Sequence, residues 1–224
     1  MIIGMDVSSY PEMKDKGYRY YDENGTEIDV LEYGKKKGFN YGRLRLWNAP
    51  QNTPESGGYS DWWADPEHQN IPKAWKDLSV DAMAQELFAF TEQALLALKE
   101  ADVYPDMIQI GNEIRNGMLF PVAKVPKWEN LAKLVNSGIA AARKVNADTK
   151  LMIHLDEGAT YAYYEEWFDH MMAQGMTDFD VIGLSYYPYI HGSFSDFEDC
   201  LQRLSQKYGK ELNVAEFAHP FRRS

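Results

Sequence analysis

Short apolar runs alternate with helical stripes along most of the chain, and this alternation constrains the fold more than any other feature. Six runs have the length and composition of strands, at residues Ile2–Val7, Asn40–Trp47, Met107–Ile114, Lys150–Asp156, Phe179–Tyr186 and Glu211–Glu216. Helical patterns separate the later runs. Repetition of strand and helix predicts a parallel sheet, either doubly wound or closed into a barrel.

Four amphipathic helices are predicted between these strands. The first covers Val80–Ala101 with Ser79 as its N-cap, and the second carries the apolar stripe from Leu131 to Ala142. A third stripe runs from Trp167 to Met172. The fourth is expected to open with Ser195-Asp196-Phe197-Glu198, a capping-box pattern. These stripes are interpreted as core faces because their spacing is that of one side of a helix.

The absence of a phosphate-binding turn favours the barrel over a doubly wound sheet. Neither G-x-G-x-x-G nor G-x-x-x-x-G-K-[ST] occurs in the chain. We therefore predict an α/β fold of the (β/α)8 TIM-barrel type, incomplete, with about six strands. No linker-like composition shift divides the chain, so residues 1–224 are expected to form a single barrel-type catalytic domain. The stretch Asn48–Leu78 carries no clear element, which marks it as functional or shortened.

Charge and composition exclude several classes of partner. Lys and Arg number 23 against 34 Asp and Glu, which gives a net charge of −11 and disfavours nucleic acid and anionic membranes. No apolar run is long enough for a membrane span, and residues 1–5 do not resemble a signal peptide. Localisation stays open: secreted if a leader has been removed, cytoplasmic otherwise. Cys200 is the single cysteine, so no internal disulfide forms, and a catalytic role for it is not expected.

The strand ends carry the candidate chemistry, because barrel enzymes act at the carboxyl face of the sheet. Glu113 and Glu216 end separate strands and could face each other, as the two carboxyl groups of a glycosidase do. Arg45, Asn112, His154 and either Tyr186 or Tyr187 could hold them and a sugar, while Trp47, Trp62 and Trp63 could stack on sugar rings. Taken singly, a strand-end Glu is more often solvated, a His satisfied and an Arg paired in the core. No metal-ligand spacing occurs, and no cofactor is expected.

The chain resembles glycoside hydrolase family 53, the arabinogalactan endo-β-1,4-galactanases. The matching motifs include Asp6–Ser9, Tyr21–Gly25, Arg43–Asn48, Ser60–Pro66, Lys73–Trp75, Gln109–Ile114, Asn116–Leu119, Met152–Asp156 and Ile182–Pro188. The resemblance implies retaining endo-hydrolysis of β-1,4-galactan in the side chains of pectin, with Glu113 as acid/base and Glu216 as nucleophile. The expected substrate contacts are Arg45, Trp47, Asp61, Trp63, Asp65, Asn112, His154, Asp156, Tyr186 and Tyr187.

Two departures from the family pattern affect these expectations. Tyr59 is followed at once by Ser60-Asp61, where family members insert a helix and a third strand, and the chain stops at Ser224 before an eighth strand. The alternative function is therefore a non-catalytic galactan-binding protein or a decayed fragment. Plant galactan or galacto-oligosaccharide is the expected partner, and self-association through open barrel edges is expected as well. The segment Tyr59–Trp75 is predicted to line the cleft, or alternatively to plug the gap.

Overall fold

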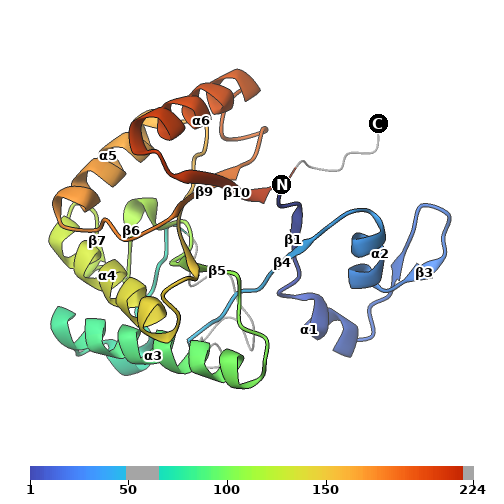
Figure 1. The fold of residues 1–224 in the computed structure, drawn as a ribbon, viewed down its shortest axis with the longest axis horizontal. Coiled ribbons are helices and arrows are strands. Elements are labelled where there is room, and N and C mark those ends of the chain that lie inside the picture. The colour runs from blue at the N-terminus through green and yellow to red at the C-terminus, as the bar shows by residue number, and fades with distance from the viewer. Residues whose placement is uncertain (49–65, 219–224) are drawn as a thin grey trace. The chain divides into compact units, whose positions relative to one another are not determined.

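A computed structural model of the chain describes residues 1–48 and 66–218. The chain divides into two compact units, Met1–Tyr59 and Ser60–Ser224, which are described separately (Figure 1). The single domain over residues 1–224 stays a prediction. Among the described residues, no helix combines the length and the apolarity needed to cross a bilayer.

The first unit is built around one pair of parallel strands. Strand β1 pairs with β4 so that Gly4 lies opposite Tyr41 and Asp6 opposite Arg43. Its elements are β1 (Gly4–Asp6), α1 (Tyr10–Asp15), β2 (Tyr20–Tyr21), β3 (Glu27–Ile28), α2 (Val30–Lys36) and β4 (Tyr41–Arg43). Strand β4 ends earlier than predicted, so Arg45 and Trp47 follow the strand.

Two residues of the α2 segment, the capping Asp29 and the buried Gly34, explain how this helix begins and how closely it approaches β1. Asp29 caps the helix by accepting hydrogen bonds from the backbone N–H groups of Leu31 and Glu32. Gly34 is buried, and a Cβ there would lie 2.0 Å from the terminal methyl of Met5. A larger residue at position 34 would therefore require the Met5 side chain to move.

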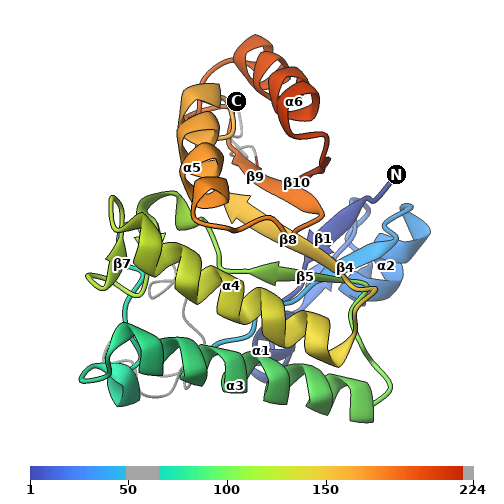
Figure 2. The ribbon, with the colours of Figure 1, turned by 60° about the vertical axis from the view of Figure 1, so that its left-hand side comes forward.

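The second unit contains a four-stranded parallel sheet in the order β10-β9-β8-β5. Helices α3 to α6 follow one another along one side of this sheet, and α3 and α4 lie side by side (Figures 1 and 2). The elements are η3 (Lys73–Trp75), α3 (Val80–Glu100), β5 (Met107–Ile110), η4 (Ile114–Asn116), β6 (Gly117–Met118), β7 (Ala123–Lys124), α4 (Trp128–Val145), β8 (Lys150–Leu155), α5 (Tyr161–Ala173), β9 (Val181–Tyr186), α6 (Phe194–Tyr208) and β10 (Glu211–Phe217).

All six predicted strands and all four predicted helices are present in the described residues. Ser79 caps α3 as expected, through a hydrogen bond from the backbone N–H of Ala82. The predicted start of α6 was wrong by two residues. Ser193 is the N-cap, and it forms a reciprocal capping box with Asp196. Both Ser193-x-x-Asp196 and Ser195-x-x-Glu198 fit a capping pattern, and the earlier pair extends the helix to include Phe194.

The core of the second unit lies between the sheet and its helices. Strand β9 is buried along its whole length, and β8 is buried from Leu151 onward. Phe168 of α5 contacts Trp167, Phe179 and Tyr208 through their rings. Strands β10 and β5 are the edges of this sheet within the described residues, and β10 exposes Val214 and Phe217. Self-association through such an edge stays a prediction.

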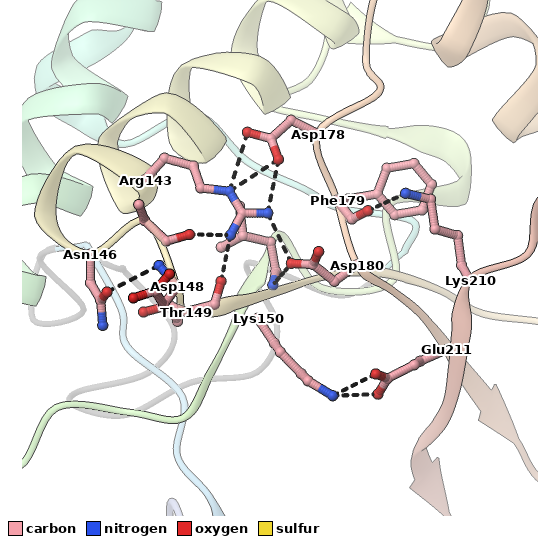
Figure 3. A network of polar contacts seen from close by, with 12 residues as sticks. Arg143, Asn146, Asp148, Thr149, Lys150, Asp178, Phe179, Asp180, Lys210 and Glu211 are labelled. Carbon is pink, nitrogen blue, oxygen red and sulfur yellow. Dashed lines mark hydrogen bonds and ion pairs between the residues drawn. The ribbon is translucent and has the colours of Figure 1, made fainter.

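Polar contacts tie the amino-terminal ends of β8, β9 and β10 together (Figure 3). Arg143 of α4 donates to the carbonyls of Ala147 and Thr149 and forms ion pairs with Asp178 and Asp180. Asp180 also accepts a hydrogen bond from the backbone N–H of Leu151. One arginine therefore links the end of α4 to the starts of β8 and β9.

Candidate active site

The turn after β5 presents Glu113 in a left-handed backbone conformation. Glu113 has φ 49° and ψ 48°, and Gly111 has φ 79°. A side chain is costly in this region, and such residues gather at functional sites. A Cβ on Gly111 would lie 2.8 Å from Ile114 Cγ2, so glycine is required there for space as well. The strand ends at Ile110, and the turn, not the strand, aims the Glu113 carboxyl.

A β-bulge aims the second carboxyl. Strands β9 and β10 pair regularly up to Leu184 and Val214, and the register then shifts so that Glu216 lies opposite Ser185. The extra residue, Ala215, is left without a partner in the ladder. Bulges of this kind redirect a side chain beside an active site.

These two features bring the predicted pair together. Glu113, His154 and Glu216 each offer one oxygen or nitrogen, and the three atoms lie within 4.8 Å of one another. His154 is fully buried, whereas both glutamates are partly exposed. The three residues come from β8, β10 and the turn after β5, so the geometry depends on the pairing of the whole sheet.

A chain of hydrogen bonds runs to Glu113 from the interior. Ser185 Oγ donates to Glu113 Oε1 at 2.5 Å, and His154 Nε2 lies 2.9 Å from Ser185 Oγ. Gln109 Nε2 lies 3.2 Å from His154 Nδ1. Ser185 and Gln109 were not predicted as site residues. A signal existed for both, because each is a polar residue inside an otherwise apolar strand.

Tyr187 holds the other carboxyl. Its hydroxyl donates to Glu216 Oε2 at 2.8 Å. Burial raises the pKa of Tyr187 well above its ordinary value, and the hydrogen bond to Glu216 and the charges of Glu216 and Glu113 act in the same direction. The phenol therefore stays protonated and remains a donor to Glu216.

Other predicted contacts have different surroundings. Tyr186 is fully buried, donates to the Gly192 carbonyl and stacks on Phe197 at 4.1 Å between ring centroids. Of the two tyrosines, Tyr187 is thus the one beside the pair. Asp156 is buried and forms a two-pronged ion pair with Arg115, with both nitrogen–oxygen distances at 3.0 Å.

The backbone around Asn112 is held from the preceding segment. Gln69 Nε2 donates to the Asn112 carbonyl at 2.8 Å, and the Asn112 side-chain oxygen lies 3.3 Å from Gln109 Nε2. Trp75 is buried in the core, whereas residues 59–65 lie outside the described residues, so both alternatives for Tyr59–Trp75 stay predictions. Trp62, together with the predicted site residues Asp61, Trp63 and Asp65, lies outside the described residues.

In the first unit, Arg45 pairs with a carboxylate. Arg45 Nε lies 2.9 Å from Asp6 Oδ2, and Arg43 contacts the same oxygen at 3.2 Å. Burial raises the pKa of Asp6, but hydrogen bonds from Ser8 and the two guanidinium charges outweigh it, and the pKa is lower than usual. Trp47 is partly buried. Asp6 was noted only as part of a motif, although it supplies the carboxylate of this cluster.

The group Glu113, His154 and Glu216 has metal-ligating chemistry, the one such cluster found among the described residues. Both ring nitrogens of His154 already have hydrogen-bond partners. A cation on His154 would therefore compete with Ser185 or Gln109.

The sequence model of glycosyl hydrolase family 53 matches residues 2–58 and 58–224, which together cover nearly the whole chain. The chain belongs to glycosyl hydrolase family 53. An uncharacterized protein in the bgaB 5′ region of Niallia circulans is 40% identical over 98% of this chain and 68% of its own length. The endo-beta-1,4-galactanase of Bacillus subtilis is 30% identical over 98% of this chain, which spans only 57% of that protein.

Solved structures confirm the family 53 fold. The catalytic domain from Ignisphaera aggregans superposes with a TM-score of 0.90 at 37% identity, over 100% of this chain and 70% of that one. A structure from work on two fungal beta-1,4-galactanases has a TM-score of 0.89 at 29% identity, over 98% of this chain and 74% of its own. The TIM-barrel type predicted from the sequence is thus confirmed.

The family match consists of two segments that meet inside the chain. The match breaks and resumes at residue 58. The alignment with the Niallia circulans protein spans 249 positions although this chain has only 224 residues, so at least 25 positions of that protein face a gap. Both findings fit the predicted loss of a helix and a strand next to Tyr59.

Proposed function

We propose that this chain is a retaining endo-hydrolase that cleaves β-1,4-galactosidic bonds in galactan, such as the arabinogalactan side chains of pectin. Glu113 is the acid/base and Glu216 the nucleophile. Membership of family 53 and the galactanase names of its relatives support the substrate class. The net charge of −11 favours a neutral polymer such as galactan over the anionic backbone of pectin.

The observation that carries the mechanism is the proximity of the two carboxyl groups. Oxygens of Glu113 and Glu216 lie within 4.8 Å of each other. Retaining glycosidases hold their carboxyl groups about 5–5.5 Å apart, whereas inverting enzymes need about 6.5–9.5 Å to admit a water molecule. The separation therefore supports direct attack by Glu216 on the anomeric carbon.

Each carboxyl has surroundings suited to its role. Glu113 gives a proton to the leaving glycosidic oxygen while Glu216 bonds to the sugar, and Glu113 then takes a proton from the water that hydrolyses the glycosyl-enzyme. The Tyr187 hydroxyl donates to Glu216 Oε2 and so orients the carboxylate for attack. As Glu216 loses its negative charge in the bond to sugar, this hydrogen bond weakens and helps the enzyme to release the sugar afterwards.

The test is release of reducing ends from pure β-1,4-galactan, with polygalacturonate as the negative substrate. Glu216→Gln should abolish release, and Glu113→Gln should lower it by about 10²- to 10⁴-fold, the usual contribution of general acid–base catalysis. Glu211→Gln is the matched control. It lies on the same strand, β10, and is exposed and paired with Lys150, so activity should be unchanged.

Two further readouts separate the alternatives. Proton NMR of the first product should show the β-anomer, and chain length should fall early, as expected for attack within the polymer. An α-anomer as first product would refute the assignment of Glu216 as nucleophile. Binding of galactan by the wild-type chain without any release of reducing ends would instead identify a non-catalytic binding protein.

A further inference from the structure

We propose that Ser185 is a positioning residue for Glu113, and that Gln109, acting through His154, fixes the direction in which the Ser185 hydroxyl donates its hydrogen. The inference rests on the proposed function, in which Glu113 is the acid/base. It assigns a role to the buried Ser185 and the half-buried Gln109, which the chemistry of the carboxyl pair does not itself require.

Gln109 determines which group donates in each hydrogen bond of the series Gln109–His154–Ser185–Glu113. Its amide nitrogen lies 2.7 Å from the Gly111 carbonyl oxygen, which can only accept. The opposite amide orientation would place two acceptor oxygens in contact, so the NH₂ group must face Gly111. The second hydrogen of that group points toward His154 Nδ1 at 3.2 Å, with the Asn112 side-chain oxygen at 3.3 Å also within reach.

The amide orientation of Gln109 in turn determines the tautomer of His154. Because Nδ1 faces a donor, it must be the acceptor nitrogen, and the ring hydrogen is on Nε2. Nε2–H then donates to Ser185 Oγ at 2.9 Å. With one of its lone pairs occupied in this way, the hydroxyl turns its hydrogen to Glu113 Oε1 at 2.5 Å, a length typical of a bond to a carboxylate.

The consequence concerns where the catalytic proton resides. The donors and acceptors in this series of hydrogen bonds cannot exchange roles, because the exchange would place a hydrogen on His154 Nδ1, facing the Gln109 donor. Oε1 of Glu113 therefore accepts from Ser185 in both protonation states of the carboxyl. The proton that reaches the leaving group must be carried on Oε2, so the relay localises the acid proton on one oxygen.

The first experiment tests the hydrogen-bond relay, formed by Gln109, His154 and Ser185, without measuring enzyme activity. Long-range proton–nitrogen correlation spectra of ¹⁵N-histidine-labelled protein distinguish the two tautomers, and the His154 signals are identified by their loss in His154→Gln. We expect a hydrogen on Nε2 and none on Nδ1. A hydrogen on Nδ1 in the wild-type protein would overturn the proposal.

The second experiment compares two substrates by kcat/KM. β-1,4-Galactan has a poor leaving group that needs the acid, whereas dinitrophenyl β-1,4-galactobioside has a leaving group that departs without a proton. Ser185→Ala should lower kcat/KM on galactan by roughly 10- to 100-fold, the value of a hydrogen bond to a charged group, and on the aryl substrate by less than about 3-fold. Ser205→Ala, an exposed serine of α6, is the matched control and should change neither value.

The outcomes separate the relay from the proposed function. Glu113→Ala serves as the benchmark and should show the same selective loss, but larger. Selective loss in Glu113→Ala without it in Ser185→Ala overturns the relay alone, and equal loss on both substrates in Ser185→Ala reduces Ser185 to a structural role. No selective loss in Glu113→Ala overturns the acid/base assignment, and with it the purpose of the relay.

Discussion

Replacement of Arg143 by Met should destabilise the second unit far more than loss of an ordinary surface ion pair. The guanidinium donates to the carbonyls of Ala147 at 3.0 Å and Thr149 at 2.6 Å, and its side chain is 22% exposed. Each hydrogen bond from a charged group contributes roughly 1.5–3 kcal/mol. The partners Asp178 and Asp180 are 59% and 39% exposed, so together they add only about 0.5–1 kcal/mol after solvent screening.

The expected cost of Arg143→Met is therefore about 3–4 kcal/mol, taking the lower value for each carbonyl because such contributions do not add fully. For a chain of this size that corresponds to a fall in Tm of about 6–15 °C. Urea denaturation followed by circular dichroism measures the free energy of unfolding. Lys133→Met is the control, because Lys133 makes one ion pair with Asp81, which is 71% exposed, and should cost under about 1 kcal/mol.

Acidification should reduce the difference in the free energy of unfolding between the wild-type protein and Arg143→Met. Burial raises the pKa of Asp180, but the hydrogen bond from the Leu151 N–H and the Arg143 guanidinium outweigh it, so the folded-state pKa is lower than usual. A lowered pKa contributes stability above the unfolded value of about 3.9, and that stability is lost as pH falls through the folded pKa. The account would be refuted if Arg143→Met and Lys133→Met lowered the free energy of unfolding equally. It would also be refuted if the difference between wild type and Arg143→Met grew below about pH 4.

Three further predictions follow from single positions. Gly183→Ala should cost about 1–3 kcal/mol and lower activity on galactan, because its Cβ would lie 3.2 Å from the Cβ of His154; an unchanged Tm and rate would contradict this. Burial raises the pKa of the Cys200 thiol to about 12, so a disulfide reagent at mildly alkaline pH should label it only as urea unfolds the chain, and rapid labelling in native buffer would count against it. Ser193→Ala should lower the free energy of unfolding by about 1 kcal/mol, since the capping box with Asp196 is lost, whereas Ser195→Ala should have little effect in the same urea titration.

The barrel-type alternation and the two carboxyl groups were predictable from the sequence. Strand and helix patterns are local, because the side-chain periods of 2 and 3.6 residues are set by the backbone of each element alone. Because all strands of a parallel barrel run in the same direction, their carboxyl ends lie on one face. Glu113 and Glu216 could therefore be expected near each other from the sequence. Their family motifs added the substrate class.

Element boundaries were predicted less well where two local signals compete. Ser193 and Ser195 both fit a capping pattern, and only the packing of the Tyr186 ring against Phe194 and Phe197 shows that the helix begins at Phe194. The apolar pattern of Asn40–Trp47 likewise extended past the end of pairing with β1, which stops at Arg43.

The tertiary structure alone decided which polar residues serve the carboxyl groups. Ser185 and Glu113 are 72 positions apart in the chain, and Gln109 and His154 are 45 apart. Neither contact leaves a periodic trace in the sequence, because each depends on the register in which β5, β8 and β9 pair. The choice of Tyr187 over Tyr186 has the same origin. Tyr186 ends β9 and Tyr187 follows the strand, and only the structure shows that the Tyr187 hydroxyl contacts Glu216 while Tyr186 is buried.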